Sequence, residues 1–431
     1  MVEEGMKSMG DAGSILKMLF PAVKNSGRMI YLIIDEYDHF ANDIIAMGDG
    51  EFYKDIIRSS GFVRDFYEAV KIGAESVIDR IFITGISPIM LDDMTSGFNI
   101  STNITMSEMF NEMLGFTENE LTESLSRLNI KKEGLGLHLK EYYNGYLFSA
   151  KSINRVYNPD MALYYLNSLV HTNMPPEQLM DDNVKTDYGR MNRLASNENN
   201  KKILGQIIKD EYIVCDIVSK FSFDRMYDDE YFVSLLFYMG MLTIDKKEHA
   251  RLQLKIPNYV VKTLYWEYMD RMLRDRFKIH IETAPLRTAI EDMAFEGRIG
   301  PFLDYISDNV LKVLSNRDLI EFDEKYIKVI LFSYLASGNV YKINSERETN
   351  SGYIDCFLEK DERMPDVKYE WLLELKYLKK GDADKLEQVK QEGMAQISRY
   401  AAAKGFDGRE NLKQALLIFI GKDKYVVVEK V

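Results

Sequence analysis

The sequence predicts an α/β protein in which two α/β regions flank a mainly helical middle. In residues 1–125, short apolar runs of strand length alternate with a segment of helical spacing, which predicts a parallel sheet. Residues 126–300 have mostly helical spacing, and strand-like segments return in residues 301–431. We therefore expect these three ranges to be separate regions of the fold.

The composition is typical of a globular chain that can bury a core. Of the 431 residues, 46% are hydrophobic and 29% are charged, close to the averages for soluble domains. At roughly 100–200 residues per domain, this length suggests about two to four domains. The net charge of −13 argues against a surface coated in basic residues for non-specific nucleic-acid binding. A local basic groove is still compatible with it.

Cysteine content and apolar runs indicate the compartment. Two cysteines, Cys215 and Cys356, exclude a disulfide scaffold and a cysteine-built zinc site, and they favour a reducing environment. No run approaches the roughly 20 consecutive apolar residues of a membrane span. The N-terminal residues lack the charged-then-apolar layout of a signal peptide. We expect a soluble cytoplasmic protein with no membrane partner.

The first region has a strand–helix–strand order. Residues 28–34 form an apolar strand pattern that ends in acids, residues 65–79 have helical spacing, and residues 80–84 form a second buried strand closed by Gly85. This order is typical of neighbouring parallel strands joined by a helix.

The middle region is predicted to be helical with one hairpin. Helical spacing covers residues 135–143, 159–169, 187–196 and 262–276. A further helix at 233–239 is followed by strand-like 241–244, a charged turn and strand-like 251–256. This helix–hairpin–helix order is that of a winged helix, and a helical region with one hairpin explains it equally well.

The last region is predicted to return to mixed α/β structure. The expected elements are a helix at 318–335, a strand at 340–344, a hairpin of 353–359 with 369–377, a helix at 383–404 and a final strand at 414–421.

An acidic pair follows the first predicted strand. In Tyr31-Leu-Ile-Ile-Asp35-Glu36, a buried strand would aim two carboxylates at the carboxyl edge of a parallel sheet. Nucleotide hydrolases use such a pair, one acid for Mg²⁺ and the next to polarise the attacking water. An ordinary strand meeting its loop would have the same residues.

The phosphate-binding loop that such a site needs is missing. Gly5 and Gly10 have the required spacing, but Asp11 follows where the lysine belongs, and no strand precedes them. No other segment matches the pattern. We therefore expect ATP to bind only if this loop comes from outside the chain.

A second acidic group lies in the predicted C-terminal hairpin. Side chains alternate along a strand, so Glu374 and Lys376 share a face, and Asp355 on the neighbouring strand would lie beside Glu374. Two carboxylates that meet there repel each other unless they share a cation, and oxygen ligands suit Mg²⁺ or Mn²⁺. Lys376 could orient and deprotonate a water and stabilise charge on phosphorus.

The alternative for this group is an exposed hairpin with a chance Glu-x-Lys pair. Apolar residues on both faces of the strand weigh against it, because a buried acid or lysine without a partner costs several kcal/mol. These apolar residues are Trp371, Leu372, Leu373 and Leu375.

Several motifs resemble, in order, those of AAA-ATPase-like proteins that carry a C-terminal PD-(D/E)XK nuclease domain. They are Ile34–Asp38, Phe82–Ser87, Leu114–Leu121, Tyr143–Tyr146, Tyr157–Pro159, Gly240–Thr243, Lys255–Asn258, Gly352–Asp355 and Leu372–Lys376. The resemblance implies a partial P-loop/AAA-type parallel sheet, a helical lid or winged-helix region, and a restriction-endonuclease-like α/β domain.

The resemblance also implies roles for the first acidic group. Asp35, in the Walker B position, would be the Mg²⁺-associated acid, Glu36 would polarise water, and Thr84 would sense the γ-phosphate. Without the loop lysine we expect these roles to be vacant and ATPase activity to be absent. A truncated gene product, a wrongly assigned start or a degenerate paralogue would each explain the missing loop.

For the C-terminal region, the resemblance makes Asp355, Glu374 and Lys376 the D, E and K of the nuclease signature. Glu324 matches an acidic position that can join the metal sphere. Gln396 and Tyr400 match the Gln-x-x-x-Tyr motif of recombination-type nucleases, and their spacing places them on one helical face. Nearby basic residues could follow a nucleic-acid backbone or form a solvated helix face: Lys379, Lys380, Lys385, Lys390, Arg399 and Lys404.

The function expected from the sequence is metal-dependent hydrolysis of nucleic-acid phosphodiester bonds, with DNA the expected substrate. The nuclease-like domain would be attached to a degenerate or truncated AAA-type module. One alternative is a non-catalytic module that binds DNA or a protein chain. Another is an ATPase whose phosphate-binding loop is supplied by a different chain.

Overall fold

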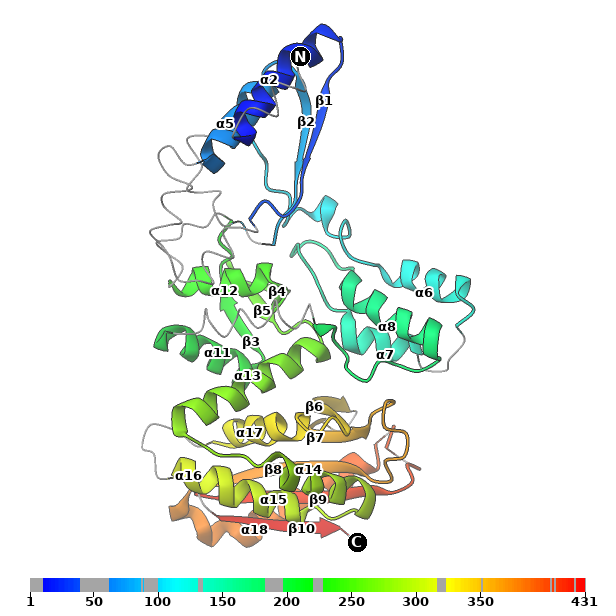
Figure 1. The fold of residues 1–431 in the computed structure, drawn as a ribbon. Helices are drawn as coiled ribbons and strands as arrows, with labels where there is room; N and C mark the ends of the chain where they lie inside the picture. The colour runs from blue at the N-terminus through cyan, green and yellow to red at the C-terminus, as the bar shows by residue number, and fades with distance from the viewer. Residues whose placement is uncertain are drawn as a thin grey trace. The chain divides into compact units, whose positions relative to one another are not determined.

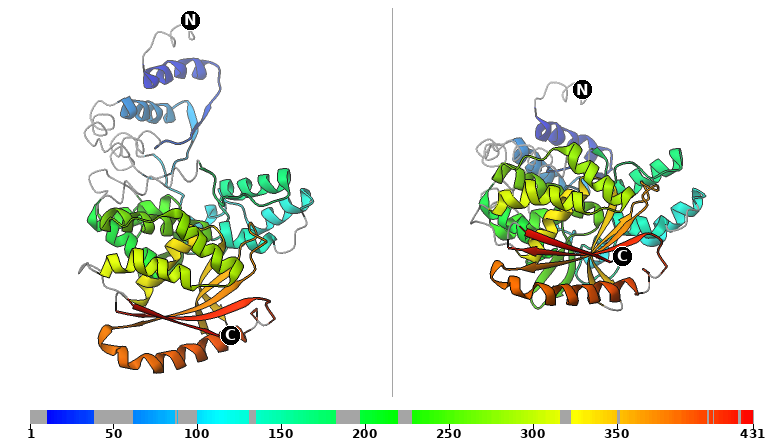
Figure 2. Two further views of the ribbon diagram at one scale, coloured as in Figure 1. Left: turned by 60° about the horizontal axis from the view of Figure 1, so that its bottom comes forward. Right: turned by 90° about the horizontal axis from the view of Figure 1, so that it is seen from below.

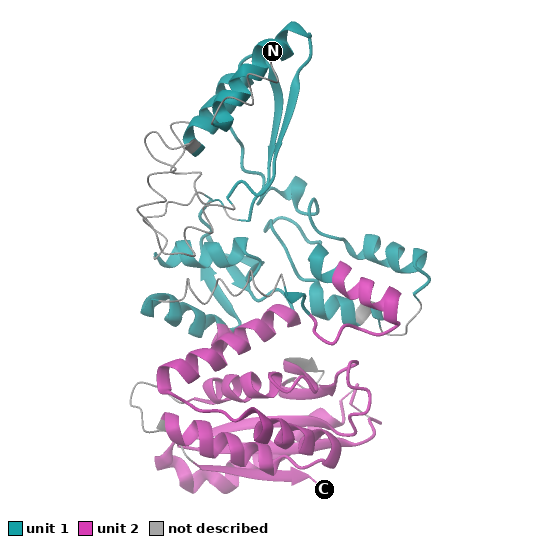
Figure 3. Ribbon diagram, viewed as in Figure 1, with its two compact units in different colours: residues 1–162, 180–207, 211–258 teal, residues 163–179, 208–210, 259–431 magenta. Residues whose placement is uncertain are grey.

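The structure is a computed structural model. It describes residues 11–38, 62–86, 88, 100–130, 135–182, 197–219, 228–315, 323–349, 352–403, 405–406, 408–421 and 424–430. The chain divides into two compact units (Figure 3). Unit 1 comprises residues 1–162, 180–207 and 211–258, and unit 2 comprises residues 163–179, 208–210 and 259–431. The division into three regions remains a prediction.

Unit 1 begins with the predicted strand–helix–strand order (Figure 1). Its elements are α2 (Ala12–Asn25), β1 (Ile30–Ile34), α5 (Phe62–Ala74) and β2 (Ile78–Ile83). β1 and β2 pair in parallel, which confirms the prediction for this segment, and Ile34 lies opposite Ile83. Apolar residues of the two helices and the two strands form a common core. A complete P-loop sheet is not confirmed, because in the described residues this sheet has two strands.

The rest of unit 1 combines helices with a small antiparallel sheet. The helices are α6 (Glu118–Arg127), α7 (Leu135–Tyr143), the start of α8 (Pro159–Thr172), most of α11 (Glu198–Asp210) and α12 (Asp229–Tyr238). The predicted hairpin is confirmed as β4 (Thr243–Glu248) and β5 (Arg251–Lys255). β3 (Tyr212–Cys215), which was not predicted, pairs with the other edge of β5. A winged helix is not confirmed, and the predicted helix at 187–196 lies outside the described residues.

Three of the sequence motifs converge inside unit 1. Gly145 has a φ of +121°, and a Cβ placed there would lie 2.0 Å from the main-chain oxygen of Pro257. The N–H of Leu147 donates to the Thr243 hydroxyl at 2.7 Å. Only glycine allows this approach, so residues 143–146, 240–243 and 255–258 form one packed junction.

Unit 2 contains a sheet covered by helices. Its helices include α13 (Tyr259–Phe277), α14 (Thr283–Glu291), α15 (Gly300–Ile306), α16 (Lys312–Ser315), α17 (Glu324–Ala336) and α18 (Leu386–Ala401). The described strands are β6 (Tyr341–Thr349), β7 (Gly352–Lys360), β8 (Glu370–Leu378), β9 (Leu412–Ile420) and β10 (Lys424–Lys430), in the order β10-β9-β8-β7-β6. β8 and β9 are parallel and the other neighbours are antiparallel. This mixed sheet fits a nuclease-like domain.

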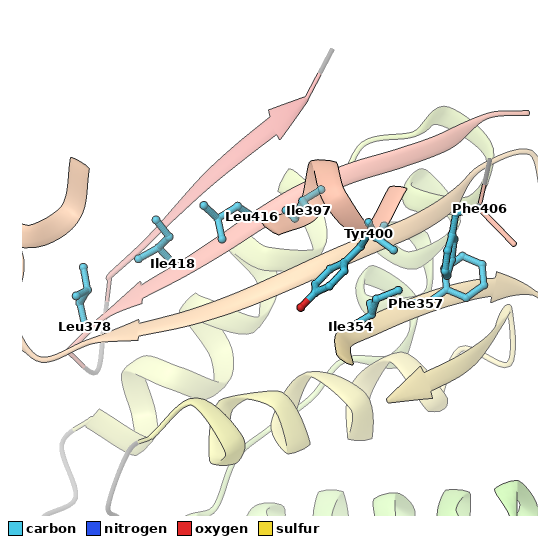
Figure 4. Packing of buried hydrophobic residues seen from close by; sticks show 9 residues of the cluster. Ile354, Phe357, Leu378, Ile397, Tyr400, Phe406, Leu416 and Ile418 are labelled. Atoms are coloured by element: carbon cyan, nitrogen blue, oxygen red, sulfur yellow. The ribbon is translucent and has the colours of Figure 1, made fainter. Parts of the chain in front are cut away.

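Helices cover both faces of the strand β8. Figure 2 shows α18 running along one face of the sheet, and Gly393 allows this close packing because a Cβ there would lie 2.6 Å from Leu416. Buried side chains of α18, β7, β8 and β9 form the core between them, including Ile397 and Tyr400 (Figure 4). On the other face, the Trp371 indole donates to the carbonyl of Met293 at 3.1 Å.

Most predicted elements of unit 2 are confirmed, with differences at their ends. The predicted hairpin corresponds to β7 and β8, and the predicted last strand corresponds to β9. β10 was not predicted, although it pairs with β9 along its whole length. No helix in the described ranges has both the length and the apolar character needed to cross a membrane.

Candidate active site

The candidate site begins where β7 and β8 stop pairing through their main chains. Cys356 lies opposite Leu373 in the ladder. At the next residue of β7, a side chain replaces the main chain as the hydrogen-bond acceptor for β8. The carboxylate of Asp355 accepts a hydrogen bond from the N–H of Leu375 at 3.0 Å. The main chain of β8 therefore fixes this carboxylate at the point of divergence.

Glu374 and Lys376 project from the same face of β8, as the strand alternation predicts. The ammonium of Lys376 lies 2.6 Å from Glu374 Oε1 and 4.0 Å from Asp355 Oδ2. The side chain of Glu374 is only 1% exposed, whereas that of Lys376 is 27% exposed. Glu374 Oε2 is buried and has no hydrogen-bond partner among the described residues. The acid is thus held on one oxygen and unsatisfied on the other.

Glu324 reaches the same site from α17. It is the first residue of this helix, and the preceding Asp323 caps the helix by accepting a hydrogen bond from the N–H of Tyr326 at 2.8 Å. The N–H of Tyr377, at the end of β8, acts as a donor to the Glu324 carboxylate, and the charges of Lys376 and Asp355 also act on it. The structure therefore brings together Asp355, Glu374, Lys376 and Glu324.

The titration behaviour of these groups reflects burial and mutual repulsion. Burial, followed by the charge of Asp355, raises the pKa of Glu374 to about 7 despite the opposing effect of Lys376. Burial likewise raises the pKa of Glu324. Burial alone would lower the pKa of Lys376, but the hydrogen bond and charge of Glu374, with the charges of Glu324 and Asp355, raise it overall. The carboxylates therefore lack enough positive charge around them.

Lys328 is a basic residue near the site that the sequence analysis did not single out. It is buried on α17, one turn beyond Glu324, and its charge acts on Glu324 and on Cys356. The i, i+4 spacing of Glu324 and Lys328 within a helix is the signal that could have identified it.

Gln396 and Tyr400 are paired with each other on α18. The Gln396 amide donates to the Tyr400 hydroxyl at 2.8 Å. Tyr400 is buried against Ile354 of β7, and a Cβ on Gly352 would lie 3.1 Å from its hydroxyl oxygen (Figure 4). No hydrogen bond within the described part of the chain joins either side chain to the acids of β7 and β8. The pair thus borders the start of β7.

In unit 1 the structure also brings Asp35, Glu36 and Thr84 together. The Thr84 hydroxyl donates to Asp35 Oδ1, which also accepts the N–H of Glu36 at 3.0 Å. Glu36 has a left-handed φ of 50°, an uncommon conformation for a residue other than glycine. These residues follow the carboxyl ends of β1 and β2, as predicted. The segment with Gly5 and Gly10 lies outside the described residues.

In the described ranges, no group of three or more His, Cys, Asp or Glu side chains is already arranged to hold a metal ion. At the candidate site, Lys376 already lies against Glu374. The oxygen donors available to a cation there are those of Asp355, Glu374 and Glu324. The unsatisfied Oε2 of Glu374 is the observation that fits an added cation.

Two segments of the chain match known families. Residues 322–429 match the family described as the PD-(D/E)XK nuclease superfamily, and residues 3–95 match the family described as a predicted AAA-ATPase. The first segment contains the acids of β7, β8 and α17, and the second contains Asp35, Glu36 and Thr84. The resemblance found in the sequence is therefore confirmed for these two segments. Neither the curated proteins nor the solved structures contain a match to the chain.

Proposed function

We propose that this protein is a metal-dependent nuclease that hydrolyses phosphodiester bonds in nucleic acid at the β7–β8 site. The observation that carries the proposal is the buried, unsatisfied carboxylate oxygen of Glu374 beside Asp355 and Lys376. It lies within the segment that matches the nuclease superfamily. A purely structural ion pair would leave no reason to bury an acid whose second oxygen lacks a partner.

Asp355, Glu374 and Glu324 would hold a divalent cation, Mg²⁺ or Mn²⁺. Both ions prefer oxygen ligands, which carboxylates supply. Such a cation supplies positive charge that lowers the pKa of a water and withdraws charge from phosphoryl oxygens. The raised pKa of Glu374 supports this assignment, because an acid that repels its neighbours gains most from added positive charge.

Lys376 acts in the proposed reaction as a fixed positive charge. Its raised pKa keeps the ammonium protonated at neutral pH, so it serves poorly as a base for the attacking water. Its N–H groups can instead orient a water and donate to the phosphoryl oxygens as negative charge builds there. Glu374 holds the ammonium in place through the 2.6 Å contact.

We propose DNA as the nucleic-acid partner. Exposed basic residues that follow β8 and lie on α18 support nucleic-acid binding. Lys379 and Lys380 follow β8 directly, and Arg399 lies on α18 beside Tyr400; all three are exposed. Phosphate groups bind such residues without reading sequence. Gln396 and Tyr400 would position the start of β7 or a phosphate next to it.

A second candidate function concerns unit 1. The contact between Thr84 and Asp35 at the ends of two parallel strands favours a nucleotide site that needs a phosphate-binding loop from another source. Nucleotide binding by the purified chain, measured by calorimetry, tests this. ATP binding by the chain alone would contradict the need for an outside loop.

The nuclease proposal is tested by cleavage of single-stranded DNA, double-stranded DNA and RNA with Mg²⁺ or Mn²⁺. Wild type is compared with Lys376→Ala and Asp355→Ala, and with Lys312→Ala as a control for an exposed ion pair distant in sequence from β7 and β8. We expect metal-dependent cutting that both site variants lose and the control keeps, with all variants folded by circular dichroism.

Other outcomes have definite meanings. No cutting, together with no Mn²⁺ binding by calorimetry, would overturn the nuclease proposal and leave a non-catalytic module that binds DNA or a protein chain. Cutting that survives both site substitutions would mean that the site lies elsewhere or that the preparation contains another nuclease.

A further inference from the structure

Two reciprocal ion pairs join the end of α11 to the residues on either side of Glu324. The ammonium of Lys209 binds the carboxylate of Asp323. The next residue, Asp210, binds the ammonium of Lys325 at 2.9 Å. Residues 208–210 belong to unit 2 together with α17, although most of α11 belongs to unit 1. We call these four residues the clasp.

The clasp acts on the part of α17 that determines the position of Glu324. Asp323 uses its two carboxylate oxygens for different tasks, one for Lys209 and the other for capping the helix at the N–H of Tyr326. Glu324 directly follows this cap, and its carboxylate is reached by the N–H of Tyr377. A shift of the first turn of α17 would therefore move Glu324 relative to β8.

The charges also suit the helix ends that they occupy. Lys209 lies in the last turn of α11, where the helix dipole favours a cation, and Asp323 caps α17, where it favours an anion. Each pair is partly exposed and by itself contributes little to stability. Together they restrain the start of one helix from two adjacent residues of another, a restraint that either pair alone would not provide.

We propose that Lys209 and Asp210 are positioning residues for Glu324, so that a segment over 100 residues earlier in the chain supports the candidate metal site. The proposal rests on the proposed function, because a misplaced Glu324 affects metal binding and cleavage only if Glu324 helps to hold the cation. Its mechanical part, the restraint of the first turn of α17, can be measured separately.

The test uses charge exchange across the pair of Asp210 and Lys325 in the full chain. The variants are Asp210→Lys, Lys325→Asp and the double exchange, which restores an ion pair with reversed polarity. Asp323 is left unchanged because it also caps α17. The control is Lys312→Asp, which reverses one charge of the exposed pair with Asp308.

Two readouts are expected to change together. The amides of residues 324–328 should exchange with solvent faster in Asp210→Lys, and the Kd for Mn²⁺ measured by calorimetry should rise about threefold to tenfold. Both should return toward wild type in the double exchange. The control should change neither, and about 1 M salt should diminish the effect because it screens partly exposed pairs.

The outcomes separate this inference from the proposed function. Unchanged exchange and unchanged Mn²⁺ affinity in Asp210→Lys, in a protein that binds Mn²⁺ and cuts nucleic acid, would overturn the inference alone. Faster exchange that the double exchange reverses, in a protein that neither binds Mn²⁺ nor cuts, would support the positioning of Glu324 and overturn the proposed function. A Kd that rises but is not rescued by the double exchange would also contradict the inference.

Discussion

The carboxylate of Asp355 accepts the N–H of Leu375 at 3.0 Å, at the position where the ladder between β7 and β8 would otherwise continue. One oxygen of this acid therefore has a structural task, completing the edge of a strand. The same oxygen, Asp355 Oδ2, lies 4.0 Å from the Lys376 ammonium, so this acid supplies both a hydrogen-bond acceptor and a negative charge at one point. The hydrogen bond and the negative charge of Asp355 can therefore be tested separately by substitution.

Asp355→Asn should separate them. An amide oxygen can still accept the N–H of Leu375, so the free energy of unfolding should fall by less than about 1 kcal/mol. The loss of the negative charge should lower metal-dependent cleavage by about 100-fold or more. Asp355→Ala should lose cleavage too, and about 1–3 kcal/mol of stability, because the N–H is left without its partner. Denaturant unfolding and cleavage assays check both; equal stability of the two variants would contradict the structural task.

In the metal-free protein, Glu374 and Lys376 should behave as a partly buried ion pair. Lys376→Met leaves the acid buried and uncompensated, which should destabilise the metal-free protein by about 3 kcal/mol. Glu374→Gln removes the uncompensated charge, so the double variant should be more stable than Lys376→Met alone. Unfolding of the four proteins in a chelator gives the interaction free energy. Additive effects would mean that the 2.6 Å contact contributes nothing.

Local patterns predicted the part of the site that lies in one hairpin. Alternation along β8 placed Glu374 and Lys376 on one face, and antiparallel pairing placed Asp355 beside them. The roles given to these residues remain predictions. β1 and β2 were also predictable, because a strand–helix–strand order has few parallel arrangements.

Contacts between distant segments were not predictable in this way. The side chain of Asp355 bonds to a main-chain group, which no residue pattern shows. Lys209 and Asp210 lie far from Glu324 in sequence, and only the fold of unit 2 brings their charges next to Asp323 and Lys325. β10 was missed because its apolar run, Tyr425–Val428, is short and lies at the edge of the sheet.

Substitution by alanine should lower the stability at Gly145 and raise it at Gly205. In Gly145→Ala the new methyl would meet the oxygen of Pro257 at 2.0 Å, at a φ that side chains rarely adopt. We expect a loss of at least about 2 kcal/mol of stability. Gly205 lies within α11 with nothing within 4 Å of the added Cβ. Gly205→Ala should raise the stability by about 0.5–1 kcal/mol, and thermal unfolding of both variants checks the difference in sign.

The capping box of α6 should make a pH-dependent contribution to stability. The Thr117 hydroxyl accepts the N–H of Glu120, and the Glu120 carboxylate accepts the N–H of Thr117 at 2.8 Å. The hydrogen bonds that the N–H and the hydroxyl of Thr117 donate to the Glu120 carboxylate lower the pKa of Glu120 below its ordinary value of 4.5. A carboxylate whose pKa is lower in the folded state stabilises the fold above its unfolded pKa, and that stabilisation is lost as pH falls through the folded value.

Glu120→Gln isolates this contribution, because glutamine can complete the capping box but carries no charge. The difference in urea midpoint between wild type and Glu120→Gln should be largest near neutral pH, where the carboxylate is charged, and should vanish toward about pH 3. Thr117→Ala, which removes the cap itself, should cost about 1 kcal/mol at neutral pH. A wild-type advantage over Glu120→Gln that stays constant down to that acidic pH would contradict the assignment, because it could not arise from the charge of Glu120.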